Sequence, residues 1–167
     1  MDRVPGFSHT EIRPASPSDI PALAEMINSA FAVEEFFEGT RTDIRRLSED
    51  MQHGTILMLE SEPGHPQASL YFEERGDHAY VGMLAVSPVM QGKGLALRLI
   101  EAAEERFRAA GLRFMEISVL SLRPELLPLY RRYGFVEAGS EPFLFARTFR
   151  DPSAQRDCHC IVMRKSL

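Results

Sequence analysis

Apolar residues recur along the chain with two spacings, and the change between them marks the expected elements. A helical spacing begins after residue 16 and lines one face for burial. The residues of this stripe are Ile20, Leu23, Ala24, Ile27 and Phe31. Ser16, Pro17 and Asp19 supply an N-cap, a favoured first helical residue and a capping-box acid. Residues 9–15 ahead of them form a short expected strand.

A second helix is expected over residues 40–54, opened by a capping pair of Thr40 and Asp43. Its apolar stripe is narrower than that of the first helix. It consists of Ile44, Leu47 and Met51. Gly54 marks its end, as glycine commonly does after the last helical turn.

Three apolar runs follow, at residues 55–61, 68–75 and 79–86. They are separated by turn-forming segments, residues 62–67 and the Arg-Gly-Asp-His stretch that follows the second run. Because such short connections favour hairpins, the three strands are predicted to be antiparallel neighbours.

A long amphipathic helix is predicted up to Gly111, which follows its last turn. Its apolar face consists of Ala96, Leu99, Ala103, Phe107 and Ala110, and its charged face of Arg98, Glu101, Glu105 and Arg108. Residues 113–120 then form a nearly continuous apolar strand, which predicts burial on both faces in a parallel arrangement.

The C-terminal part is predicted to hold a short helix over residues 123–134 and two strands over 135–139 and 158–165. A long loop at residues 140–157 connects the strands. The full order is strand, two helices, three strands, helix, strand, helix, strand, strand. This order predicts an α+β chain with a mixed sheet of about seven strands and about four helices.

Length and composition indicate one globular domain over residues 10–167, preceded by a tail at residues 1–9. The net charge is −5, and lysines and arginines are scattered rather than clustered. A nucleic-acid partner is therefore not expected, because that binding needs a clustered basic surface. The acidic balance fits a cationic or amine substrate, and it fits an ordinary solvated surface as well.

Two cysteines, Cys158 and Cys160, stand one residue apart. This spacing suits alternate positions of a terminal strand better than a disulfide or a zinc site, which needs a second ligand pair. The sequence has no apolar run of about 20 residues and no secretory leader at its start. We therefore expect a cytoplasmic protein without a metal or a membrane partner.

The segment 91–96 places Gly92 and Gly94 at the start of the long helix, directly after a strand that ends at Val86. Unpaired backbone N–H groups and the helix dipole make such a turn an anion site. A P-loop does not fit, because a glycine rather than a serine or threonine follows Lys93. The dinucleotide fingerprint fits poorly, because position 97 is leucine.

Residues 81–111 resemble the coenzyme-A-binding core of the GNAT superfamily of N-acetyltransferases. Its signature is Gln or Arg, two residues, Gly, one residue, then Gly or Ala, which Gln91, Gly94 and Ala96 meet. Residues 124–139 resemble the family's later motif, a short helix with a tyrosine followed by Gly-Phe. The order of elements also matches the GNAT acyl-CoA N-acyltransferase fold.

The resemblance implies an acetyltransferase that moves an acetyl group from acetyl-CoA to a primary amine by direct attack in a ternary complex. Tyr130 would protonate the departing thiolate. The cofactor's pyrophosphate would bind the main chain of Gln91, Gly92, Lys93, Gly94, Leu95 and Ala96. The pantetheine arm would pair with Leu84, Ala85 and Val86, where a main-chain N–H would also hold the oxyanion. Lys93 would assist the phosphates or simply be solvated.

For the acceptor, the resemblance implies a site between the loop after the first helix and the last strands. Glu34 and Glu35 would attract an ammonium group, and Phe143 would shape an apolar pocket; Glu116 is a candidate base. Arg123 replaces an asparagine common in the family, and would meet a cofactor phosphate or pair with the nearby Glu125. The acceptor, a small amine or a peptide amine, stays open, as do a homodimer and a non-catalytic acyl-CoA-binding module.

Overall fold

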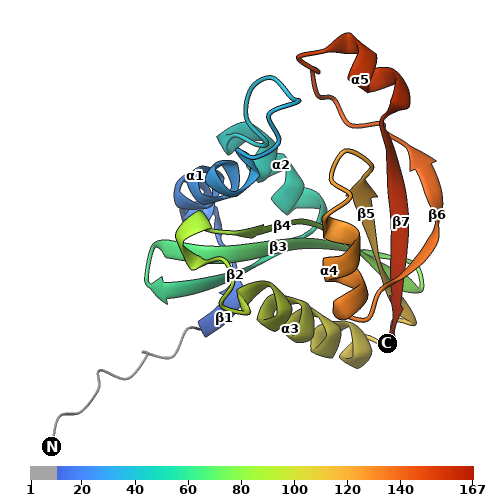
Figure 1. Cartoon of the computed structure of the whole chain (residues 1–167). Helices are drawn as coiled ribbons and strands as arrows, with labels where there is room; N and C mark the ends of the chain where they lie inside the picture. The colour runs from blue at the N-terminus through green and yellow to red at the C-terminus, as the bar shows by residue number, and fades with distance from the viewer. Residues whose placement is uncertain (1–10) are drawn as a thin grey trace, which may run out of the picture.

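Seven strands form one mixed sheet in the order β1-β2-β3-β4-β5-β7-β6 (Figure 1). The computed structural model describes residues 11–167, so the expected tail at 1–9 lies outside the described residues. The strands are β1 Glu11–Pro14, β2 Thr55–Glu62, β3 His65–Arg75, β4 His78–Val86, β5 Phe114–Leu120, β6 Val136–Pro142 and β7 His159–Ser166. The helices are α1 Ile20–Phe31, α2 Ile44–His53, α3 Leu95–Ala109, α4 Leu126–Arg132 and α5 Pro152–Asp157.

The strand pairing confirms the mixed sheet predicted from the sequence. Strands β1 to β4 pair antiparallel with their neighbours, as the short turns between β2, β3 and β4 predict. β5 runs parallel to β4, and β7 pairs antiparallel with both β5 and β6. The parallel pair therefore lies at the middle of the sheet, where the chain crosses over through α3.

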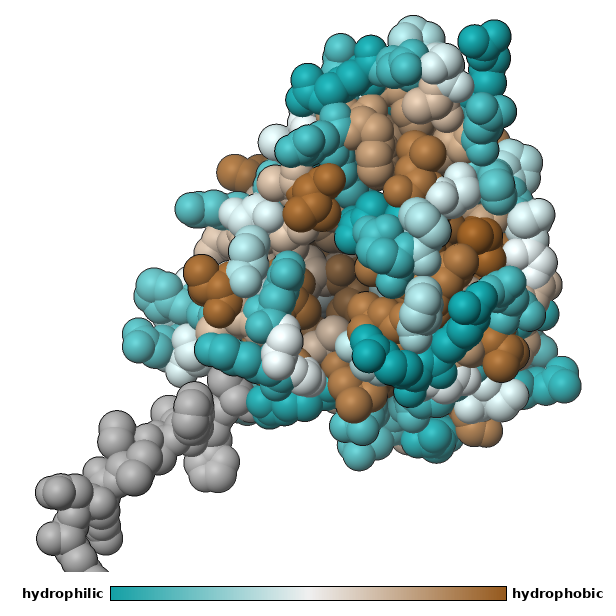
Figure 2. Space-filling view, viewed as in Figure 1, coloured by the Kyte–Doolittle hydropathy of each residue, from teal (hydrophilic) through white to brown (hydrophobic). Residues whose placement is uncertain are grey.

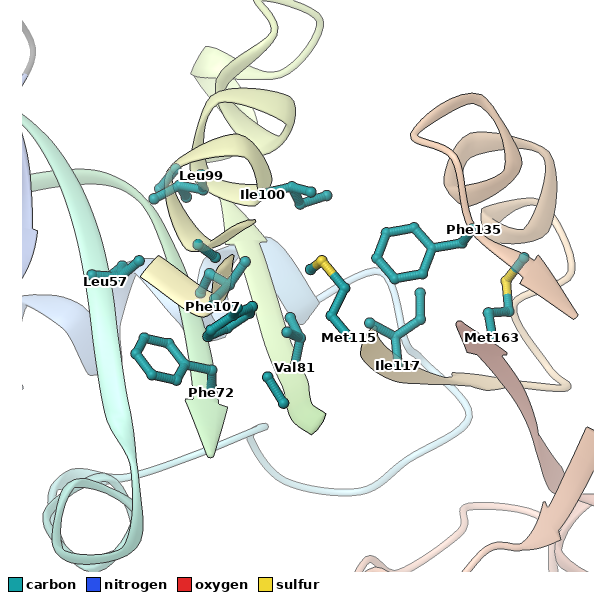
Figure 3. Close-up of a cluster of buried hydrophobic side chains, with 14 of the residues drawn as sticks. Leu57, Phe72, Val81, Leu99, Ile100, Phe107, Met115, Ile117, Phe135 and Met163 are labelled. Atoms are coloured by element: carbon teal, nitrogen blue, oxygen red, sulfur yellow. The ribbon is translucent and has the colours of Figure 1, made fainter. Parts of the chain in front are cut away.

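Helices cover both faces of the sheet and bury two separate cores (Figure 1). α1 and α2 pack on one face, where Leu23, Ile27 and Leu47 are fully buried. α3 packs on the other face, and Phe107 meets Phe72 edge-on with ring centroids 4.9 Å apart (Figure 3). The predicted apolar faces of the first and the long helix are thus largely confirmed, since Leu99, Ala103 and Phe107 of α3 are buried, but Ala110 follows the end of α3 and is exposed.

Three details of the predicted elements are wrong. α2 begins at Ile44, capped by the Asp43 carboxylate, which accepts a hydrogen bond from the Arg46 N–H at 2.8 Å. The Thr40 hydroxyl instead donates to the Thr42 carbonyl, and Ile44 is 57% exposed rather than part of a buried stripe. β5 is buried at alternate residues only, because Met115, Ile117 and Val119 face the core cluster, whereas the residues between them are only partly buried.

The loop predicted at residues 140–157 is shorter than expected. β6 continues to Pro142, and α5 occupies Pro152–Asp157. The Asp151 carboxylate caps α5 by accepting from the Ser153 N–H at 2.9 Å. This Asp-Pro-Ser start is a recognisable N-terminal signal, but α5 is only six residues long and has no apolar stripe.

An ion-pair network ties β1 to the start of α1. Arg13 donates to both carboxylate oxygens of Asp19 at 2.9 Å and to Glu60 at 2.7 Å. Asp19 also accepts from the Ser16 N–H at 2.8 Å, which completes the capping box that the sequence predicts. The Arg13 guanidinium holds the pKa of the Asp19 carboxyl well below its usual range.

Asp19→Asn should therefore make the free energy of unfolding depend less on pH under acidic conditions. A lowered pKa in the folded state means that the ionised Asp19 adds stability above its unfolded pKa of about 3.9, and that this is lost as the pH falls. Urea unfolding at several pH values between 7 and 2 should show a steep loss below about pH 4 for the wild type and a shallower one for the variant. Glu49→Gln, which breaks an exposed pair with Arg45, is the control and should leave the curve unchanged. Equal curves for wild type and Asp19→Asn would contradict the network's role.

Candidate functional site

Strands β4 and β5 separate halfway along their length, and the candidate site lies where they part (Figure 1). Their pairing ends at Val81 and Ile117, although both strands continue. In β4 a bulge follows, with Met83 at a φ of 50° and a register shift against β3. Backbone groups of Leu84–Val86 that face away from β3 consequently have no β5 partner, and an extended ligand could pair with them.

A cavity of about 750 Å³ fills this opening. Figure 2 shows this face of the molecule hollowed near its middle, with hydrophobic residues recessed behind hydrophilic ones. The sequence-predicted residues that line the cavity are Glu34, Leu84, Ala85, Val86, Gln91, Gly92, Gly94, Leu95, Ala96, Arg123, Tyr130 and Phe143. Lys93, Glu35 and Glu116 do not line it. The fold thus gathers both motifs around one cavity, although they are distant in sequence.

The glycine turn between β4 and α3 has the conformation that an anion site needs. Gly92 and Gly94 have φ values of 77° and 78°, and Gly94 is the N-cap residue of α3. A side-chain carbon added at either glycine would meet no atom within 4 Å, so the turn borders open space. The first N–H groups of α3 have no partner within the helix and point out of its N-terminal end.

The long side chains of the turn lie at its edge. The Lys93 ammonium contacts the Met90 sulfur at 3.8 Å and is exposed. The Gln91 amide donates to the Val86 carbonyl at 3.4 Å, which ties the turn back to β4. Anion binding at this turn would therefore depend chiefly on the main chain.

Tyr130 lies on α4 at the cavity wall, and its ring is fixed by aromatic neighbours. It meets the rings of Phe135 and Tyr133 edge-on, at centroid distances of 5.8 and 6.2 Å. Within residues 11–167, its hydroxyl forms no hydrogen bond, so it is available to a bound molecule. Burial raises the pKa of the Tyr130 hydroxyl to about 12, and the hydroxyl therefore keeps its proton at neutral pH.

The residues expected to attract an ammonium group are differently engaged. Arg123 donates to the Glu34 carboxylate at 2.9 Å and to Glu125 at 2.5 Å, so the positive charge of Arg123 already balances Glu34. Glu35 is exposed and lines a second pocket of about 200 Å³, which shares Glu34, Arg41 and Arg147 with the larger cavity. Glu116 accepts from Arg164 at 2.8 Å outside the cavity, which is against its assignment as the base.

Arg123→Met should destabilise the protein, because it leaves the Glu34 carboxylate, whose side chain is 9% exposed, without its partner. Loss of a charge-assisted hydrogen bond in such surroundings lowers the free energy of unfolding by about 1–3 kcal/mol. Urea unfolding measures this, and adding Glu34→Gln should restore part of the loss. Arg45→Met removes a solvent-exposed pair as a control and should cost under about 1 kcal/mol. Equal losses in the two arginine variants would argue against the Arg123–Glu34 pair.

Further polar residues that the sequence analysis does not single out also line the cavity, among them Arg41, Asp50, Tyr80 and Arg147. Burial raises the pKa of the Asp50 carboxyl and of the Tyr80 hydroxyl. Tyr80 lies on β4 under Arg75, whose guanidinium is 4.2 Å from the ring centroid. The sequence held no signal for this group, because only the three-dimensional fold brings a helix, a strand and two loops together here.

The described residues contain no group of three or more histidine, cysteine or acidic side chains placed to hold a metal ion. Cys158 and Cys160 are both buried and unpaired, and burial raises the pKa of the Cys160 thiol to about 11. None of the helices in residues 11–167 is long and apolar enough to cross a membrane.

Comparison with known proteins supports a family assignment. A family model described as an acetyltransferase (GNAT) domain matches residues 24–146. An acetyltransferase of Agrobacterium fabrum is 39% identical over 61 residues, which are 36% of this chain and 43% of that protein. The chain thus aligns with less than half of that relative's length.

Solved structures share the fold across nearly the whole chain at low sequence identity. The ribosomal-protein-S18-alanine N-acetyltransferase of Escherichia coli has a TM-score of 0.70 and 18% identity, with 95% of this chain and 94% of that chain covered. An acetyltransferase structure from Salmonella typhimurium, solved with its cofactor acetyl-CoA, has a TM-score of 0.69 and 19% identity, with 96% and 95% covered.

Proposed function

The chain belongs to the GNAT acetyltransferase family, and on that premise we propose that it transfers the acetyl group of acetyl-CoA to a primary amine by direct attack within a ternary complex. The observation that carries the proposal is the single cavity shared by the glycine turn, the free edge of β4 and Tyr130. One end suits the cofactor, and the other end, beneath the loop after α1, is left for the acceptor.

The cofactor end is built from main chain. The pyrophosphate would be held by the N–H groups of residues 91–96, where the two glycines keep the approach open. The pantetheine arm would lie along Leu84–Val86 and pair with the backbone groups that β5 leaves free. Lys93, at the edge of the turn, would contribute a screened surface charge at most.

The chemistry forms a carbon–nitrogen bond and breaks the carbon–sulfur bond of the thioester. A main-chain N–H of Leu84–Val86 would hold the carbonyl oxygen as it gains negative charge. Tyr130 would give its hydroxyl proton to the departing sulfur and recover a proton from the amine through water. Because its pKa is raised to about 12, Tyr130 carries its proton before each turnover.

The test is a panel of amines incubated with the protein and acetyl-CoA, with the released thiol and the acetylated product both quantified. With at least one primary amine, we expect thiol and N-acetyl product in equal amounts. Only other amines should compete with that acceptor. Thiol release without any acetylated amine, or no affinity for acetyl-CoA in calorimetry, would refute the proposed function. Transfer to hydroxyl acceptors alone would refute the amine assignment while leaving acetyl transfer intact.

A further inference from the structure

Two arginines enter the acceptor end of the cavity from different parts of the chain. Arg41 comes from the loop between α1 and α2, and Arg147 from the segment between β6 and α5. Each is half-buried, and each guanidinium lies over an aromatic ring. The distance is 5.3 Å from Arg41 to the Phe31 centroid and 4.1 Å from Arg147 to the Phe37 centroid.

These two guanidiniums lack the partner that their neighbours have. Among the described residues, neither Arg41 nor Arg147 forms an ion pair with a carboxylate, whereas Arg46 pairs with Asp43 at 3.6 Å and Arg123 with Glu34 at 2.9 Å. Arg132 also lines the cavity and forms no ion pair among the described residues. It is exposed, however, and lies on α4 near Tyr130.

The two charges also act on each other. Burial lowers the pKa of the Arg147 guanidinium, and the positive charge of Arg41 lowers it further. Asp50 interacts electrostatically with Arg41, and Glu34, already paired with Arg123, is the acid that acts on Arg147. Partly desolvated cations of this kind gain from an added anion, since a paired charge costs less to bury than an unpaired one.

Building on the proposed function, we propose that the acceptor carries a carboxylate close to its amine, as an α-amino acid does, and that Arg41 and Arg147 bind this carboxylate. Planar guanidiniums match a carboxylate with two parallel hydrogen bonds, and stacking on Phe31 and Phe37 keeps each one oriented. The carboxylate would anchor the acceptor at the outer end of the cavity. Its amine would then face inward, toward the opening between β4 and β5.

A cofactor phosphate is the other source of anionic oxygens in this cavity. It would have to reach across the cavity, because the glycine turn at the start of α3 lies away from the loops that carry Arg41 and Arg147 (Figure 1). Acetyl-CoA affinity separates the two sources. If the arginines bind the acceptor, Arg41→Met and Arg147→Met should leave the calorimetric affinity for acetyl-CoA unchanged; a weakened affinity in both would overturn the proposal.

The decisive experiment compares the twenty common amino acids with their α-amides and with the corresponding decarboxylated amines. The wild type should acetylate at least one free amino acid with a kcat/KM about 10- to 100-fold above that of its amide. Arg41→Met and Arg147→Met should remove this preference, mainly by raising KM for the amino acid. Arg45→Met, an exposed arginine of α2 outside the cavity, is the matched control and should keep it.

Equal use of acids and amides would overturn the carboxylate site while leaving the proposed transfer to amines intact. If no amine at all is acetylated, the proposed function is refuted, and the carboxylate site is then tested by ligand binding alone. Calorimetry with N-acetyl amino acids and their amides, on protein saturated with CoA, should then show binding of the acids that Arg147→Met abolishes. Absence of such binding would overturn the site. A circular dichroism spectrum and melting curve of each variant separate these effects from misfolding.

Discussion

Replacing Tyr130 by phenylalanine should lower kcat about 100-fold, within the range typical of a lost general acid, and should leave acetyl-CoA affinity unchanged. The exchange removes one oxygen and keeps the ring. The edge-on contacts with Phe135 and Tyr133 therefore persist, and α4 has no reason to move. Single-turnover acetylation of the best amine found in the panel measures the chemical step, and calorimetry measures cofactor binding.

Tyr133→Phe is the matched control, because Tyr133 is the C-cap residue of the helix that carries Tyr130 and also lines the cavity. Its turnover should stay within about 3-fold of the wild type if Tyr130 alone supplies the proton. Unchanged turnover in Tyr130→Phe would refute the acid role. A wild-type protein that binds acetyl-CoA and acetylates nothing would favour the non-catalytic acyl-CoA-binding alternative.

The pH profile gives a second check on Tyr130. Its pKa of about 12 means that the hydroxyl stays protonated through the range in which the enzyme can be assayed. The rate should therefore show no fall attributable to Tyr130 between about pH 6 and 10, and any rise with pH should report deprotonation of the amine or of its proton acceptor. A fall near pH 9 that disappears in Tyr130→Phe would contradict the raised pKa.

The glycine turn at one end of the cavity could be predicted from the sequence because it depends on local backbone. The signature at Gln91, Gly94 and Ala96 is contiguous, and glycines at a helix start signal a turn with positive φ. The element order then placed the strand ending at Val86 beside that turn. Tyr130 could be predicted as a cavity residue for a similar reason, since the Gly-Phe pair that follows it fixes where α4 ends.

The end of the cavity beneath the loop after α1 could not be predicted, because it depends on contacts between distant segments. Glu34 looks like a free carboxylate in the sequence, yet Arg123, 89 residues away, neutralises it. Arg41 and Arg147 look like ordinary loop charges until the fold brings them into one cavity. Side-chain periodicity describes single elements, so it contains no information on which loops meet.

The errors within elements have the same origin. Ile44 belongs to the apolar stripe that the sequence predicts for α2, but it is 57% exposed, and Leu47 is the residue of this helix that is buried against the sheet. The apolar run of β5 predicts burial on both faces, but only the face with Met115, Ile117 and Val119 is buried, and Glu116 on the other face pairs with Arg164. A hydrophobic run thus indicates a strand more securely than it indicates what covers it.

Gly94→Ala should weaken acetyl-CoA binding by about 10-fold or more, because the added carbon would stand in the open space where the pyrophosphate approaches the first N–H groups of α3. The variant also carries a conformational cost of about 1–2 kcal/mol, since alanine is strained at a φ of 78°. Binding and stability must therefore be measured separately, by calorimetry with acetyl-CoA and by urea unfolding.

Gly111→Ala supplies the matched control, because Gly111 follows the other end of the same helix with a φ of 75° and equally open surroundings. Both variants should lose similar stability, since the backbone strain is the same. Only Gly94→Ala, and in parallel Gly92→Ala, should lose affinity, because the partial positive charge and the unpaired donors belong to the N-terminal end of α3 alone. Equal affinity in Gly94→Ala and Gly111→Ala would mean that the cofactor's phosphates do not bind at this turn.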